Sequence, residues 1–175
     1  MLKKVLNLYK EIGETPLQTI ERFSAAHPEY SKEKMTYAGR LDPMAEGILI
    51  VLVGEETKKR EEYTDLDKEY EFEWIFGIET DTYDLLGIVE PSLDSFFEPN
   101  EKKVKKWVTT QKGTFAQKYP PFSSKVVDGK PLFVWAKGGR FPKGFVVPEH
   151  EVEIKKIKYQ GVHTLSRAEL ESYIN

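Results

Sequence analysis

The 175-residue sequence contains no cysteine and only three histidines. The absence of cysteine excludes disulfide scaffolds, thiolate zinc sites, iron–sulfur clusters and cysteine nucleophiles. His27, His150 and His163 show neither an i, i+4 pairing nor an acidic cluster at metal-ligand spacing, so we expect no metal. No apolar run approaches the roughly 20 residues of a membrane span, and the N-terminus lacks the apolar core of a signal peptide. We therefore expect a cytoplasmic protein with no membrane partner.

Hydrophobic residues make up 39% of the chain and aromatic residues 13%, which is enough to build one sizeable core. There is no internal repeat, no low-complexity tract and no composition shift that marks a linker. Residues 1–175 are therefore expected to form a single mixed α/β domain.

Charge is distributed unevenly along the chain, although the net charge is only −3. Residues 55–100 hold fifteen acidic and four basic side chains, whereas residues 101–145 hold eleven basic and two acidic ones. This segregation predicts a basic face that is a candidate contact for a phosphate backbone. Lysines that merely solubilise loops would give the same count.

Local patterns predict two elements near the N-terminus. Thr15 as N-cap, Pro16 at the first helical position and Gln18 three residues after the cap predict a helix. The apolar run at 48–53, closed by Gly54, predicts a strand buried on both faces.

The rest of the chain offers weaker signals. In the stretch 69–80, four aromatic residues at 70, 72, 74 and 76 alternate with Glu69, Glu71, Glu73 and Ile75, and this period of two predicts a strand with one solvent-exposed face. Further expected elements are a short strand at the end of 81–90, a helix around 104–108, a long loop with short elements over 113–144, an alternating strand over 147–162 and a helix after the cap Ser166.

Asp42 stands out as a candidate catalytic residue. It lies in a Gly- and Pro-bounded loop that runs directly into the predicted strand at 48–53. A carboxylate in this position can act as nucleophile or acid, because loops at strand ends combine access with fixed geometry. Asp42-Pro43 is also ordinary turn chemistry, and the pattern alone favours that interpretation.

The stretch AGRLDPMAEGILIVLVGEETKK, residues 38–59, resembles the catalytic motif of the TruB family of tRNA pseudouridine synthases. The matching positions are Gly39, Leu41, Asp42, Pro43, Ala45, Gly47, Gly54, Thr57 and Lys58. Other family segments follow in the expected order. They match at Lys10, Gly13 and Thr15, then at Lys68, Tyr70, Gly77, Thr80, Asp81, Thr82, Asp84 and Gly87, and again over 119–139.

The resemblance implies a pseudouridine synthase-type domain with a central, largely antiparallel sheet and flanking helices. It implies isomerisation of uridine to pseudouridine in RNA, in the T-loop of tRNA, on a nucleotide flipped out of its stack. Asp42 would be the nucleophile, attacking either the ribose or the base, and no cofactor is required. RNA, as the tRNA T-arm, is the expected partner of a monomeric protein.

Other site residues follow from the same resemblance. Tyr70 matches the tyrosine that packs on the flipped base, a role that an aromatic ring suits. Asp84 matches the acidic residue that holds a catalytic arginine. Lys10, Lys58 and Lys125 are expected phosphate contacts that position the RNA. Tyr37 and Arg40 flank or lie within the catalytic motif and are expected to contact the substrate, with Tyr37 standing where many members have a histidine.

One departure from the family pattern concerns catalysis. The family's later motif with an arginine that pairs with the nucleophilic aspartate has no match, and Arg167 lies in a helix-like segment. Either the natural chain continues past Asn175, or this form supplies the arginine differently, or it lacks it. The alternative function is therefore a non-catalytic RNA-binding or RNA-folding module. A glycosidase using two carboxylates would need a sugar site that the sequence does not reveal.

Overall fold

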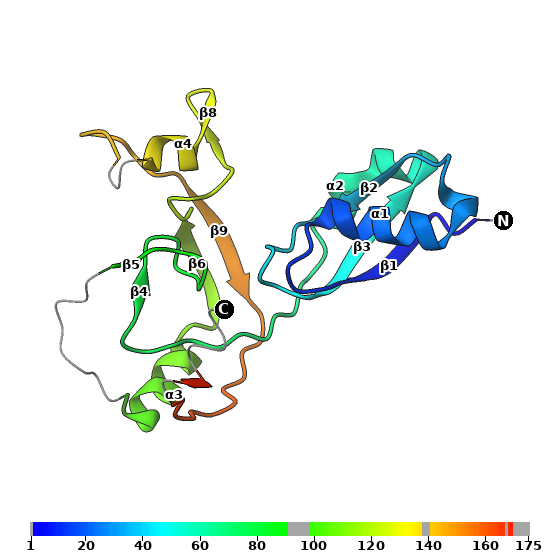
Figure 1. Ribbon diagram of the computed structural model, residues 1–175. Coiled ribbons are helices and arrows are strands. Elements are labelled where there is room, and N and C mark those ends of the chain that lie inside the picture. The colour runs from blue at the N-terminus through cyan, green and yellow to red at the C-terminus, as the bar shows by residue number, and fades with distance from the viewer. Residues whose placement is uncertain (1, 91–98, 138–140, 167, 170–175) are drawn as a thin grey trace. The chain divides into compact units, whose positions relative to one another are not determined.

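The computed structural model describes residues 2–90, 99–137, 141–166, 168 and 169 (Figure 1). Contacts divide the chain into two compact units, Met1–Phe72 and Glu73–Asn175. The single domain expected over 1–175 stays a prediction. No helix in the described part is long and apolar enough to cross a membrane.

The first unit is built on a three-stranded antiparallel sheet. Its strands, in spatial order, are β1 (Val5–Lys10), β3 (Gly47–Val53) and β2 (Met35–Ala38). The register places Leu6 and Tyr37 on either side of Val51. The predicted apolar strand is thus the central strand, and it is fixed by hydrogen-bonded neighbours on both sides.

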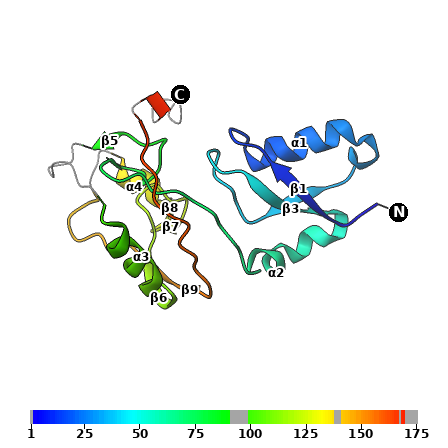
Figure 2. The same ribbon diagram turned by 90° about the horizontal axis from the view of Figure 1, so that it is seen from below.

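Helix α1 (Pro16–Ala26) covers one face of this sheet (Figure 2). The predicted start is confirmed, because the Thr15 hydroxyl accepts from the Gln18 amide and the Gln18 side chain accepts from the Thr15 amide at 2.7 Å. The helix packs Ile20 and Phe23 against the strands. The buried core comprises Leu6, Ile20, Tyr30, Leu49, Val51 and Val53.

Two 3₁₀ turns and a short helix complete the first unit. They are η1 (Pro28–Tyr30), η2 (Gly54–Lys59) and α2 (Arg60–Thr64). Figure 2 shows α2 on the side of the sheet opposite α1. This cover is incomplete, since Ile48 is 62% exposed. The prediction that the strand at 48–53 is buried on both faces is therefore wrong at Ile48.

In the described part of the second unit, short antiparallel strand pairs occur together with the helices α3 (Glu101–Thr110) and α4 (Leu132–Ala136). The pairs are β4 (Glu79–Thr80) with β5 (Val89–Glu90), β6 (Gly113–Lys118) with β9 (Glu149–Ile154), and β7 (Val126–Val127) with β8 (Lys130–Pro131). The expected short strand, the helix after Pro99, the loop with short elements and the last strand are confirmed, although β9 ends at Ile154. All described strand pairs are antiparallel, as the fold class requires.

The strand predicted over 69–80 is wrong except for its last two residues, which form β4. Residues 69–78 are irregular, and the rings of Tyr70, Phe72, Trp74 and Phe76 are 66%, 62%, 49% and 41% exposed. Alternation supplies the side-chain pattern of a strand, but a strand also needs a neighbour that accepts and donates backbone hydrogen bonds. No described strand pairs with residues 69–78.

The helix predicted after Ser166 is described only at its start. The Ser166 amide donates to Glu169 Oε2 at 2.7 Å, and the Glu169 amide donates to Ser166 Oγ at 3.3 Å. This reciprocal pair is the expected capping box. The remainder of that prediction, at 167 and 170–175, lies outside the described residues.

Candidate active site

The Asp42 loop, residues 39–46, connects β2 to the central strand β3 (Figure 1). Gly39 and Gly47 bound it with φ of +81° and +135°, values that residues with a Cβ rarely adopt. The Ala45 amide donates to the Asp42 carbonyl at 2.9 Å and closes a turn. The Asp42 side chain is exposed, and no described residue donates a hydrogen bond to its carboxylate. The loop thus presents an accessible carboxylate at the start of a rigid strand.

The segment after β1 holds this loop in place. The Gly13 amide donates to the Pro43 carbonyl at 2.7 Å. The Lys10 ammonium donates to the Ala45 carbonyl at 2.5 Å and to the Glu11 carbonyl at 3.0 Å. Two donors from residues 10–13 therefore clamp the loop at Pro43 and Ala45, on either side of its tip.

Lys10 itself has no exposed surface. The expected contact between Lys10 and an RNA phosphate does not fit this burial, because the ammonium is enclosed and bonded to carbonyl oxygens. The physical reason is the register, which sets Lys10 opposite Gly47 at the end of β1, beside the loop. Sequence reasoning identified Lys10 but assigned it to the surface.

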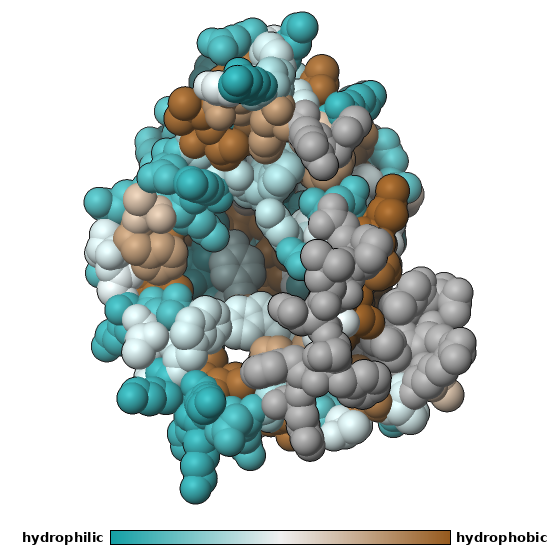
Figure 3. Space-filling view, turned by 90° about the vertical axis from the view of Figure 1, so that its left-hand side faces the viewer, coloured by the Kyte–Doolittle hydropathy of each residue, from teal (hydrophilic) through white to brown (hydrophobic). Residues whose placement is uncertain are grey.

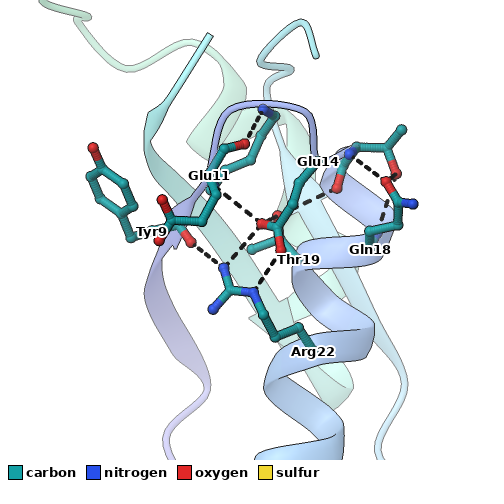
Figure 4. A network of polar contacts seen from close by, with 8 residues as sticks. Tyr9, Glu11, Glu14, Gln18, Thr19 and Arg22 are labelled. Atoms are coloured by element: carbon teal, nitrogen blue, oxygen red, sulfur yellow. Dashed lines mark hydrogen bonds and ion pairs between the residues drawn. The ribbon is translucent and has the colours of Figure 1, made fainter. Parts of the chain in front are cut away.

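A polar network fixes the same segment to α1 (Figure 4). Glu14 accepts from Arg22 Nε at 2.6 Å, from the Thr19 hydroxyl at 3.0 Å and from the Glu11 amide at 3.1 Å. Arg22 Nη2 also donates to the Tyr9 carbonyl at 2.8 Å. The Arg22 guanidinium, helped by the Glu11 amide, lowers the pKa of the Glu14 carboxyl to about 2. The clamp is therefore itself anchored to the helix.

Tyr37 lies on β2 and packs partly against the core. The Arg60 guanidinium lies 5.9 Å from the centre of the Tyr37 ring, and Arg60 Nε donates to the Tyr37 carbonyl at 3.0 Å. Sequence reasoning missed Arg60. Its position two residues after Lys58 of the motif was the available signal. Arg40, two residues before Asp42, is exposed.

Tyr70 lies in the irregular segment after α2, still within the first unit. No hydrogen bond or ring contact joins it to Asp42, and two thirds of its surface is exposed. The structure therefore brings the Asp42 loop together with Lys10 and Gly13, but it does not bring Tyr70 into contact with Asp42.

Asp84 and Lys125 belong to the second unit. Asp84 Oδ1 accepts from the Thr82 hydroxyl at 2.8 Å and from the Leu86 amide at 2.9 Å, so it organises the turn between β4 and β5. The Lys125 ammonium lies 5.1 Å from the centre of the Tyr119 ring. Lys125 is exposed and available to a ligand.

Two surface hollows of the first unit lie away from Asp42. One, of about 300 Å³, is lined by Arg60, Glu61, Thr64 and Asp65. The other, of about 180 Å³, runs between β1 and α1 and is lined by Leu8, Tyr9, Thr19, Arg22, Phe23, Ala26 and His27. Within the described residues, no group of three histidines or carboxylates is placed to hold a metal ion. The candidate site is accordingly an exposed loop whose chemistry is that of a single carboxylate.

The sequence profile of the TruB family pseudouridylate synthase (N terminal domain) matches residues 28–173. The chain belongs to the TruB family. The matched stretch contains Asp42, Tyr70, Asp84 and Lys125, while Lys10 precedes it.

Individual relatives agree with this membership. The chain is 33% identical over 161 residues to tRNA pseudouridine synthase B of Borreliella burgdorferi, covering 92% of this chain and 52% of that protein. It is 35% identical over 127 residues to tRNA pseudouridine synthase B of Caldicellulosiruptor saccharolyticus, covering 73% of this chain and 40% of that protein. It is 32% identical over 149 residues to tRNA pseudouridine synthase B of Aquifex aeolicus, covering 85% of this chain and 47% of that protein. The chain thus spans about half the length of the TruB relatives it matches.

Proposed function

We propose that this chain is the catalytic domain of a tRNA pseudouridine synthase that isomerises a uridine in the T-loop of tRNA. The observation that carries the proposal is the Asp42 loop. Its carboxylate is exposed, no described residue donates a hydrogen bond to it, and Gly13 and Lys10 clamp the backbone on both sides of the loop tip. A loop needed only as a turn has no requirement for an accessible acidic side chain held this firmly.

The proposed isomerisation requires a carboxylate held in position beside the uridine. In the isomerisation the N1–C1′ bond of uridine breaks and a C5–C1′ bond forms, while C5 loses a proton and N1 gains one. All atoms of the base are retained, so neither an oxidant nor a metal is required. Asp42 would attack the ribose or the base and split the reaction into two easier steps. The clamp would keep the carboxylate in a geometry suited to attack.

The remaining residues would bind the substrate. The target base has to leave its stack, at a cost of a few kcal/mol, and the exposed ring of Tyr70 would supply a surface on which it packs. Tyr37 would stack as well, with its ring held by Arg60. Arg40 and Lys125, both exposed, would neutralise phosphates. Asp84 keeps the role that the family resemblance implies, as the residue that holds an arginine.

The test is direct detection of pseudouridine in a tRNA T-arm hairpin after incubation with the 175-residue chain. Asp42→Asn is the matched control, because it keeps the shape of the side chain and removes the nucleophile. We expect product from the parent and a loss of at least about 10³-fold in the variant. Equal product from both proteins would overturn the assignment of Asp42.

A second candidate is an RNA-binding module without turnover. It is favoured by the absence, within the described residues, of a guanidinium bonded to the Asp42 carboxylate. An arginine bonded to the carboxylate would orient the nucleophile, so a chain without one would bind RNA but turn over slowly. If the parent and Asp42→Asn both bind the hairpin with equal affinity and neither forms pseudouridine, this second candidate replaces the first.

A further inference from the structure

Helix α3 carries a dense row of lysines. Lys102, Lys103, Lys105 and Lys106 are all exposed, whereas Val104 and Val108 face inward. At about 100° per residue, the four lysines occupy the side of the helix opposite the two valines. None of the four forms an ion pair with a described residue, although the protein as a whole is acidic.

These lysines work against the stability of the helix that bears them. Lys102 and Lys103 lie in the first turn, where the helix dipole disfavours positive charge, and the last turn holds no basic residue at all. Lys102 and Lys106 are spaced i, i+4, at which like charges repel. A sequence that only had to form a soluble helix would place its lysines elsewhere, so the arrangement points to a negatively charged ligand.

Aromatic rings lie beside this lysine row. The Trp107 ring on α3 lies 5.1 Å from the Trp74 ring, centre to centre, at an interplanar angle of 53°. Each tryptophan is 49% exposed. Figure 3 shows hydrophilic side chains projecting at the lower end of the molecule, at the height of α3 in Figure 1. Lysines next to exposed indoles are the combination with which proteins hold single-stranded nucleic acid, stacking bases and neutralising phosphates.

We propose that the lysine row of α3, together with Trp107 and Trp74, binds an unpaired stretch of RNA outside the catalytic loop. The proposal deepens the proposed function, on which it rests for the choice of RNA. The lysines contact phosphates, and the Trp107 ring stacks on a base. The ligand is single-stranded because a base inside a duplex cannot expose its face to an indole.

The first experiment measures the salt dependence of binding by the full chain to a fluorescein-labelled oligouridine of about ten nucleotides. The variant is Lys102→Gln, Lys105→Gln, Lys106→Gln. Its control removes three exposed lysines from the first unit, as Lys3→Gln, Lys32→Gln, Lys34→Gln, and changes the net charge equally. At about 0.7 counterions per phosphate contact, the slope of log K against log salt should fall by roughly 2 in the α3 variant alone. Equal slopes for the two variants would overturn the proposal.

The second experiment reports on the indole. Binding of oligouridine should quench tryptophan emission in the parent and in Trp135→Phe, whose ring contacts Phe145 instead. Trp107→Ala should lose most of the quenching and bind about 5- to 150-fold more weakly. Unchanged quenching in Trp107→Ala, or equally tight binding of a blunt RNA duplex by the parent, would refute base stacking.

Failure of this inference is distinguishable from failure of the proposed function. The α3 variant should make pseudouridine at the parent rate in a T-arm hairpin without single-stranded tails. Loss of turnover there would place the lysines in the catalytic site and contradict a separate surface. Conversely, the parent could form no pseudouridine while its affinity for oligouridine still depends on the α3 lysines. That result would support the RNA-binding surface and contradict the proposed synthase activity.

Discussion

At the scale of single residues, Lys10 shows how a buried charge can serve a neighbouring loop. Its ammonium satisfies the carbonyl of Ala45, 35 residues away, and its own neighbour Glu11. No local pattern predicts this contact, because it depends on β1 reaching Gly47 in register. The family resemblance identified the residue, but only the pairing of the strands shows what its side chain does.

Replacing Lys10 should therefore loosen the loop. We expect Lys10→Met to lower the free energy of unfolding by about 1.5–3 kcal/mol, since hydrogen bonds to a charged group are lost and a carbonyl is left unpaired. Amide exchange at Gly13, which bonds the same loop, should accelerate. Urea unfolding and native-state hydrogen exchange measure both effects. Lys3→Met, at an exposed lysine just before the same strand, should change stability by no more than about 0.5 kcal/mol. A similar loss of stability in both variants would contradict a specific role of Lys10 in holding the loop.

Glu14 gives a pH-dependent prediction. Its pKa is about 2 in the folded chain, against an ordinary value of 4.5, because Arg22 favours the charged form. A lowered folded-state pKa contributes stability that is fully present above pH 4.5 and disappears as the pH falls towards 2. The urea midpoint of the parent should exceed that of Glu14→Gln at pH 6, and the gap should close by about pH 2. Glu21→Gln, on the exposed side of the same helix, is the control, and a gap independent of pH would refute the ion pair.

At the scale of elements, the sequence predicted correctly those features that depend on hydrogen bonds between residues close in the chain. The start of α1 followed from Thr15 and Gln18, whose bonds lie within one turn. The strand expected over 69–80 failed because strand formation depends on a partner distant in the sequence, and alternation carries no information about that partner. The turn of Asp84 is local in the same way, since aspartate in turns commonly accepts hydrogen bonds from backbone amides close in the sequence, here that of Leu86.

The β4–β5 connection depends on one glycine. A Cβ at Gly87 would lie 2.8 Å from Asp81 Oδ1 and 2.8 Å from Thr80 Cβ, well inside normal contact. Gly87→Ala should cost about 1–3 kcal/mol and speed exchange of the Ile88 amide, which donates to Asp81 Oδ1. Gly129→Ala is the control. Its φ of +76° disfavours alanine but nothing lies within 4 Å, so the Ile88 amide should keep its protection. Protection unchanged in Gly87→Ala would rule out the steric reason.

At the scale of the whole molecule, the division into two units bears on how the chain folds. The core around Leu49 and Val51 draws all its buried members from Met1–Phe72. The three strands of that sheet also pair only with one another among the described residues. The first unit therefore supplies both the paired strands and the buried core that packs on them, which composition alone could not indicate.

Because the sheet and its core come from the first unit, we predict that residues 1–72 fold without the rest of the chain. A fragment of this length is marginal, because a domain near 60 residues buries only about 60% of its unfolded surface. We expect protected amides at Val51 and Leu52 in the isolated fragment, with a lower urea midpoint than in the full chain. Hydrogen exchange followed by NMR measures this. Unprotected amides would favour the single cooperative domain expected from the sequence.

The hydrogen bonds from Lys10 and Gly13 also bear on attempts to transplant the Asp42 loop to another protein. The Asp42 loop is not a self-supporting module, since two of its carbonyls are satisfied from residues 10–13 and that segment is tied in turn to α1. Grafting residues 39–47 onto another scaffold would move the carboxylate but leave its support behind. A graft that keeps the support of the loop would need β1, the first turns of α1, and β2 and β3 on either side of the loop.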